Sequence, residues 1–140
     1  MAEPLPFAVR GLDHVVLRVS DVPRVERFYR DVIGCSLERR QDRIGLTQLR
    51  AGATLIDLVD IAGEIGRAGG AAPGREGRNM DHFCLRIDPF DGPIIARHLR
   101  AHGIEPGDVG LRFGADGEGP SIYLEDPEGN RLELKGPPIA

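Results

Sequence analysis

A short segment near the start of the chain is repeated once, and each copy carries a histidine. Residues 12–21 read LDHVVLRVSD and residues 80–89 read MDHFCLRIDP. The two copies share Asp13/Asp81, His14/His82, Leu17/Leu85 and Arg18/Arg86, after a shift of 82 − 14 = 68 residues. A chain that uses one such unit twice is expected to build two similar modules. Two modules can bring two imidazoles to one point, so the repeat predicts a metal site.

Both copies alternate as half-buried strands do. The first copy places Val15, Leu17 and Val19 on one face, and the other face carries His14 and Arg18. The second copy follows the same pattern around His82. Each strand is therefore expected to pack its apolar face and to present its histidine on the opposite side.

A helix and three extended segments are expected after each of these strands. The first helix begins near Asp21 and Pro23 and ends at Gly34, and the second runs from Asp91 to Gly103. The extended segments are 36–40, 44–50 and 53–60, then 107–113, 120–125 and 130–135. The predicted fold class is α+β, with two βαβββ modules at about 10–61 and 80–136 in one domain spanning 1–140. The linker at 62–79 is rich in Gly, Ala and Arg and is expected to be mobile.

Length, charge and cysteine content exclude several classes of protein. A chain of 140 residues is sized for one domain, and a net charge of −4 makes nucleic acid an unexpected partner. No apolar run approaches the roughly 20 residues that span a bilayer, so no membrane partner is expected. Two cysteines form no disulfide framework, and no signal peptide is visible, which indicates the cytoplasm.

A carboxylate pair repeats in the same way as the histidine pair. Leu55-Ile-Asp57-Leu-Val59 corresponds to Arg131-Leu-Glu133-Leu-Lys135, and the flanking apolar residues place each acid opposite the packed face. A single strand histidine more often makes a hydrogen bond than binds a metal, and a single carboxylate is usually solvated. The recurrence of both pairs favours a site for a divalent ion, namely Zn, Ni, Mn, Co or Fe.

Four segments, at 12–17, 27–34, 80–82 and 121–134, resemble the vicinal oxygen chelate superfamily. It includes glyoxalase I, methylmalonyl-CoA epimerase, extradiol dioxygenases, fosfomycin-resistance transferases and bleomycin-binding proteins. The resemblance implies two βαβββ modules that form a U-shaped mixed sheet around a metal, and a homodimer in which each chain often supplies two ligands. The implied ligands are His14, Asp57, His82 and Glu133.

Asp57 departs from the Glu, Gln or His usual at its position in this superfamily, and its side chain is one methylene shorter. If all four residues bind, Glu133 or Asp57 can act as the general base of a glyoxalase-like lyase or isomerase that stabilises an enolate or oxyanion. If Asp57 does not bind, the other three form the facial triad of an Fe(II) extradiol dioxygenase. The third alternative is a metal-free antibiotic-binding resistance protein, although such proteins tend to lose the His and Glu ligands.

Three further side chains are candidates for contact with a small-molecule substrate. Tyr123 alternates with apolar neighbours and can donate to an oxyanion, or can simply be a half-buried strand residue. Arg18 and Arg86 share the histidine faces and can bind an anionic substrate, or can lie at the rim of the sheet. The sequence does not indicate which substrate the protein uses.

Overall fold

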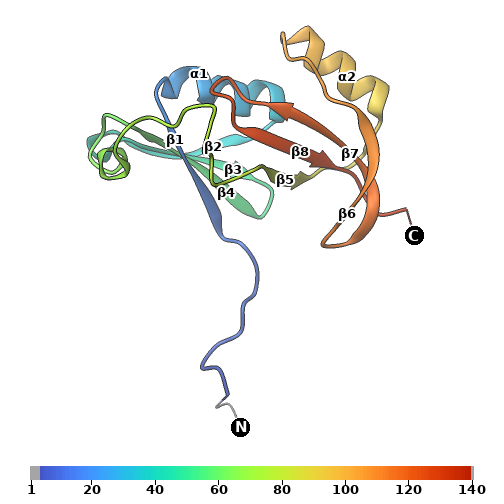
Figure 1. Ribbon diagram of the computed structural model, residues 1–140, viewed down its shortest axis with the longest axis horizontal. Coiled ribbons are helices and arrows are strands. Elements are labelled where there is room, and N and C mark those ends of the chain that lie inside the picture. The colour runs from blue at the N-terminus through green and yellow to red at the C-terminus, as the bar shows by residue number, and fades with distance from the viewer. Residues whose placement is uncertain (1–3, 140) are drawn as a thin grey trace.

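The structure, a computed structural model, describes residues 4–139 and contains two βαβββ modules, which confirms the predicted α+β class. The first module consists of β1 (His14–Val19), α1 (Val22–Arg27), β2 (Ser36–Gln41), β3 (Leu46–Ala51) and β4 (Thr54–Asp60). The second consists of β5 (Phe83–Arg86), α2 (Gly92–Ala101), β6 (Val109–Gly114), β7 (Gly117–Glu125) and β8 (Arg131–Lys135). Figure 1 shows the two modules side by side, with the N-terminal segment leading away from both.

The strands form two four-stranded mixed sheets with the same topology, ordered β1-β4-β3-β2 and β5-β8-β7-β6. In each sheet the first strand is parallel to the fourth, and the other pairs are antiparallel. This order brings the histidine strand beside the carboxylate strand. The register pairs Val16 with Asp57 and Cys84 with Glu133, so each acid lies two positions along from its histidine.

Both helices begin at an aspartate, as predicted. The side chain of Asp21 accepts a hydrogen bond from the Arg24 backbone N–H, and Asp91 does the same for Ile94. The first helix differs from a single α-helix, because after Arg27 it continues as a π-helical segment, Phe28–Ile33, up to a left-handed Gly34. A local apolar pattern does not distinguish an α turn from a π turn, since both bury the same side of the helix.

The apolar faces of the two modules join in one core, which includes Tyr29, Leu58, Leu99 and Leu132. The Tyr29 hydroxyl donates to Asp126 in the turn between β7 and β8 at 2.8 Å, which ties the two modules together. The linker, expected to be mobile, is held at its start by Arg18 and near its end by Arg78. Within residues 4–139, no helix has the length and apolar character needed to cross a membrane.

Candidate metal centre

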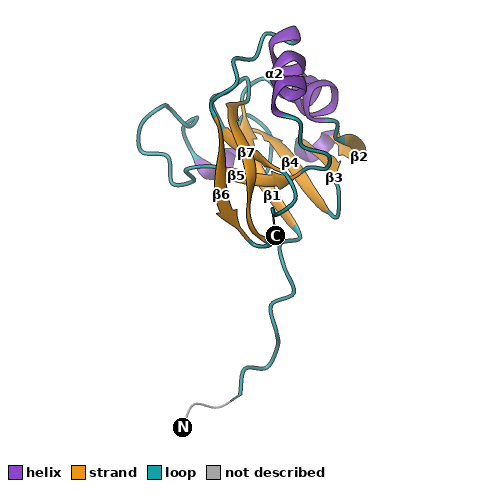
Figure 2. Ribbon diagram, turned by 90° about the vertical axis from the view of Figure 1, so that its right-hand side faces the viewer, coloured by secondary structure: helices purple, strands orange, loops and turns teal. Residues whose placement is uncertain are grey.

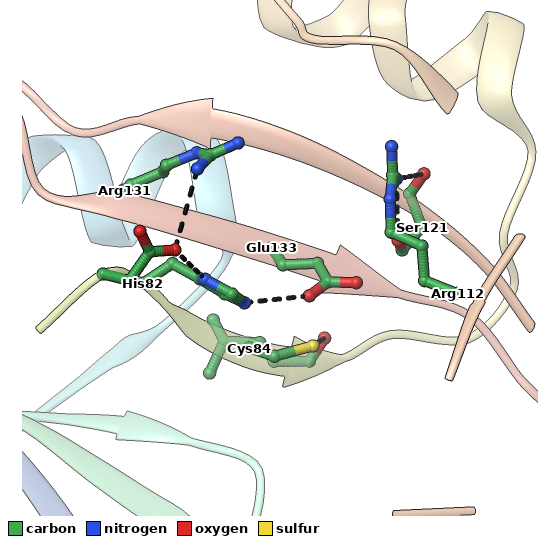
Figure 3. A network of polar contacts seen from close by, with 8 residues as sticks. His82, Cys84, Arg112, Ser121, Arg131 and Glu133 are labelled. Carbon is green, nitrogen blue, oxygen red and sulfur yellow. Dashed lines mark hydrogen bonds and ion pairs between the residues drawn. The ribbon is translucent and has the colours of Figure 1, made fainter. Parts of the chain in front are cut away.

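The second module places His82 and Glu133 face to face. His82 Nε2 lies 3.2 Å from Glu133 Oε1, and Glu133 is only 5% exposed. Figure 3 shows the imidazole directed along the sheet toward the carboxylate, with Cys84 beside them. Two ligands of one divalent ion are roughly 3 to 3.5 Å apart when each bond is about 2.1 Å. The separation of these two atoms therefore fits joint binding of one ion.

The first module repeats this arrangement with a longer separation. His14 Nε2 lies 4.0 Å from Asp57 Oδ2, and Asp57 is 4% exposed. Both oxygens of Asp57 also accept from the Gln48 amide at 3.3 Å. The shorter aspartate side chain, held by Gln48, leaves a wider gap than Glu133 does. Asp57 thus reaches an ion bound to His14 only through a small shift or a water molecule.

An aspartate orients each of the two imidazoles. The Nδ1 atoms of His14 and His82 each lie 2.7 Å from the carboxylate of the preceding residue, Asp13 or Asp81. A carboxylate accepts but does not donate, so Nδ1 carries the proton and Nε2 is left with a lone pair. Metal-binding histidines are commonly fixed in this way. The hydrogen bond with Asp13, aided by the charge of Asp57, also raises the pKa of His14.

Two features of the pair His82–Glu133 fit a bound cation. His82 Nε2 and Glu133 Oε1 lie 3.2 Å apart, and either a proton or an ion must lie between two such acceptor atoms. Glu133 Oε2 is buried and has no hydrogen-bond partner among the described residues. Burial raises the pKa of Glu133, but Ser121, Tyr123 and His82 outweigh this effect and hold it below its usual value. Glu133 is therefore a charged carboxylate with a free oxygen, and it fits a metal ligand.

The four predicted ligands form two pairs within one chain and do not form a cluster of four. Among residues 4–139, no three His, Cys, Asp or Glu side chains are grouped closely enough to hold an ion. The pairs lie on different sheets, each in its own module. One chain therefore holds two separate histidine–carboxylate pairs, His14–Asp57 and His82–Glu133, each of which is a candidate half-site.

Tyr123 lies against the second half-site. Its ring meets the His82 ring edge-on at 5.0 Å between centroids, and the guanidinium carbons of Arg112 and Arg131 lie 4.7 and 4.3 Å from its centroid. Burial, followed by the proximity of Glu133, raises the pKa of Tyr123, so its hydroxyl keeps its proton at neutral pH. Tyr123 is thus a potential proton donor beside His82.

The two predicted anion-binding arginines have different surroundings. Arg18 donates to the carbonyls of Gly66, Gly70 and Ala71, so its guanidinium is occupied by the linker. Arg86 is exposed and pairs with Asp116. Only Arg86 remains accessible to an anion from solvent.

Sequence reasoning assigned no role to Asp13, Asp81, Gln48 or Arg131. The repeated Asp-His doublet carried the signal for the two aspartates, because both copies keep an acid immediately before the histidine. No local signal identified Gln48, which meets Asp57 only through the pairing of β3 with β4. Arg131, at the start of β8, likewise reaches Asp81, which precedes β5, at 3.7 Å.

Known proteins share this arrangement of modules. The family model described as Glyoxalase/Bleomycin resistance protein/Dioxygenase superfamily matches residues 11–134. Virulence protein STM3117 of Salmonella typhimurium is 33% identical over 135 residues, which cover 94% of this chain and 88% of that protein. Mitochondrial methylmalonyl-CoA epimerase of Mus musculus is 25% identical over 130 residues, covering 89% and 71% of the two chains.

Solved structures of other proteins have a similar fold. An integron cassette protein from V. cholerae superposes with a TM-score of 0.73 at 25% identity, covering 94% of this chain and 98% of that one. Lactoylglutathione lyase from Agrobacterium tumefaciens superposes with a TM-score of 0.63 at 21% identity, covering 91% and 94%. The likeness to the lyase concerns the fold alone.

Proposed function

Because the chain belongs to the glyoxalase/bleomycin resistance protein/dioxygenase superfamily, we propose that it is a metal-dependent enzyme acting on a small molecule with two neighbouring oxygen atoms. The observation that carries the proposal is the buried Oε2 of Glu133, which has no partner among the described residues and lies beside the His82 imidazole, whose Nδ1 is bonded to Asp81. Imidazole and carboxylate donors together suit Zn, Ni, Mn, Co or Fe.

His14, His82 and Glu133 would hold the ion. When bound, it would act as a Lewis acid toward the two substrate oxygens. Asp57 is the better placed general base, because it lies farther from its histidine than Glu133 does and, among the described residues, only the Gln48 side chain donates to its carboxylate. The lowered pKa of Glu133 keeps that residue ionised and makes it a good ligand. We therefore assign proton abstraction from the substrate to Asp57.

Tyr123 and Arg86 complete the proposed substrate site. The Tyr123 hydroxyl would donate to an oxygen on which negative charge develops, because its raised pKa keeps it protonated. Arg86 would bind an anionic group of the substrate in exchange for Asp116. The methylmalonyl-CoA epimerase among the similar proteins supports isomerase chemistry over oxygen chemistry.

We infer that the working form is a homodimer. One chain brings its two half-sites into no common cluster within residues 4–139. A site made of His14 and Asp57 from one copy and His82 and Glu133 from a second copy would unite two imidazoles and two carboxylates. The cytoplasm remains the proposed compartment, which cell fractionation would test.

One observation favours a second candidate function. Asp57 is held by Gln48 at 4.0 Å from His14 Nε2, which is beyond the separation expected for two ligands of one ion. Without Asp57, the remaining two imidazoles and one carboxylate match the facial triad of Fe(II) oxygenases. A ring-cleaving dioxygenase is therefore the alternative to the lyase or isomerase.

Metal loading and proton exchange test the proposal together. The protein would be loaded anaerobically with Ni²⁺, Zn²⁺, Mn²⁺, Co²⁺ or Fe²⁺, and we expect about one ion per chain. Glu133→Gln should lose the ion, whereas His102→Ala, which changes an exposed histidine outside the site, should keep it. In D₂O, the metal-loaded protein should catalyse the exchange of solvent deuterium for the hydrogens beside the carbonyl of hydroxyacetone. Asp57→Asn should abolish this exchange while retaining the ion.

The outcomes separate the alternatives. Oxygen uptake with catechol by the Fe²⁺ form, without hydrogen exchange, would favour the dioxygenase. If the protein binds none of these ions, the enzyme proposal fails and the metal-free binding protein is the better description.

A further inference from the structure

The two modules differ at the same outer edge of their sheets. β2 and β6 are the last strands in the orders β1-β4-β3-β2 and β5-β8-β7-β6. β2 reads SLERRQ, and its charged side chains protect an open edge from pairing with another chain. β6 reads VGLRFG and exposes Val109, Leu111 and Phe113, of which Phe113 is 82% exposed. The edge at β6 therefore lacks the protection that the equivalent edge has.

The segment before β1 has a matching apolar pattern. Leu5, Phe7 and Val9 alternate along a segment with no helix or strand and a bend at residues 6 and 7, and they are 70–85% exposed. Figures 1 and 2 show this N-terminal arm, residues 4–10, running away from both sheets of its own chain. The arm lies outside residues 11–134, which match the family model. Such apolar exposure marks an interaction surface.

We propose that the N-terminal arm of one copy adds as a strand to the β6 edge of a second copy. Leu5, Phe7 and Val9 would then share a face with the apolar residues of β6, because both sets repeat every second residue. This inference goes beyond the proposed function, since it needs a second copy of the chain but no metal.

The prolines of the arm support this pairing. Pro4 and Pro6 lack a backbone N–H, and they alternate with Leu5 and Phe7. Along a strand, the backbone N–H groups of successive residues point alternately toward the neighbouring strand and away from it. The prolines can therefore face solvent while Leu5 and Phe7 donate to β6. Prolines that face outward also prevent a further strand from adding to the sheet. Edge strands tolerate proline at such solvent-facing positions.

Length and direction favour a second copy over the arm's own chain. Residues 10–13 connect the proposed paired segment to β1, and at about 3.3 Å per residue they cover about 13 Å when extended. The arm can therefore pair with a β6 edge that lies within about 13 Å of the start of β1 in the other copy. The arm leaves β1 directed away from its own second module (Figure 1), and its bend at residues 6 and 7 would straighten on pairing with β6.

A double-mutant cycle on the dimer tests the contact. Leu111→Lys, which gives β6 the kind of charge that β2 carries, and deletion of residues 2–10 should each weaken self-association at least about tenfold. The two changes together should weaken it no further, because they remove the same contact. Sedimentation equilibrium in EDTA measures this without a metal, and Arg39→Lys on β2 is the matched control. Additive effects, or no effect of the deletion, would overturn the proposal.

A cross-link between two chains gives an independent test, in a Cys84→Ser background. A chain with Phe7→Cys, mixed with a chain with Leu111→Cys, should form a disulfide-linked heterodimer under mild oxidation. Replacing the second chain by one with Arg39→Cys should give no such product. Absence of the heterodimer would overturn the proposal, even if the mixed protein binds metal. If the heterodimer forms but the protein binds no metal, the proposed pairing of the arm with β6 stands and the proposed function fails.

Discussion

The aspartate before each histidine fixes the orientation of the histidine ring and the nitrogen that carries its proton. Asp81 accepts from His82 Nδ1 at 2.7 Å, which fixes the ring and makes Nε2 a better electron donor. We expect Asp81→Asn to weaken metal affinity by about 10- to 100-fold, with little change in Tm. Competition against a fluorescent chelator measures the affinity. Glu38→Gln, on an exposed ion pair with Arg50, is the control, and equal affinities in the two variants would contradict the orienting role.

Glu26 links stability to pH through one carboxylate. It is 7% exposed and bonded to Arg30 and Arg40. Burial raises the pKa of Glu26, but the bonds with Arg40 and Arg30 outweigh burial and hold it below 4.5. Because the pKa of Glu26 is lower in the folded protein than in the unfolded protein, ionised Glu26 stabilises the fold at pH values above 4.5, its pKa in the unfolded protein. This stabilisation is lost as the pH falls through the pKa of Glu26 in the folded protein.

We therefore expect Glu26→Gln to reduce the free energy of unfolding by about 1–2 kcal/mol near neutral pH. The difference from the unmodified protein should shrink once the pH drops below 4.5. Urea unfolding at a series of pH values measures both quantities. Glu105→Gln, at an exposed pair with Arg100, should have a smaller effect at every pH. A pH-independent difference for Glu26→Gln would show that its effect comes from packing.

At the scale of elements, Arg18 holds the linker to β1. Its guanidinium donates to three carbonyls between Gly66 and Ala71. Arg18→Ala should release this segment, and the backbone amides of residues 66–71 should exchange with solvent at least about tenfold faster. Hydrogen exchange followed by mass spectrometry measures the change. A loss of anion binding with unchanged exchange would instead support the substrate-binding role expected from the sequence.

The elements that could be predicted are those that depend on local pattern. Alternation around His14 and Asp57 identified which face of each strand carries them, because side-chain direction in a strand follows from sequence spacing alone. The repeat then paired each histidine with its carboxylate, and both pairs are present. The contacts that were missed depend on distant segments. Gln48 meets Asp57 through strand register, and Arg18 meets the linker through its path over β1. Neither contact leaves a trace in local spacing.

At the scale of the whole molecule, the sequence could not show whether four ligands meet in one chain. That question depends on how one module packs against the other, which the shared core and the Tyr29–Asp126 bond determine. With this packing, the pairs His14–Asp57 and His82–Glu133 remain on separate sheets. On the proposed function, each chain would hold two halves of a site, and two copies would hold two whole sites.

Mixed dimers test this arrangement. In a dimer of one His14→Ala chain with one His82→Ala chain, both changes would fall in one composite site, and the other site would keep both histidines. We expect neither variant alone to bind metal tightly, whereas mixing them after unfolding and refolding together should restore about one tight site per mixed dimer. Metal titration of the mixture, with each variant alone as control, measures the restoration. If each site lies within one chain, every chain in the mixture is defective and no tight site returns.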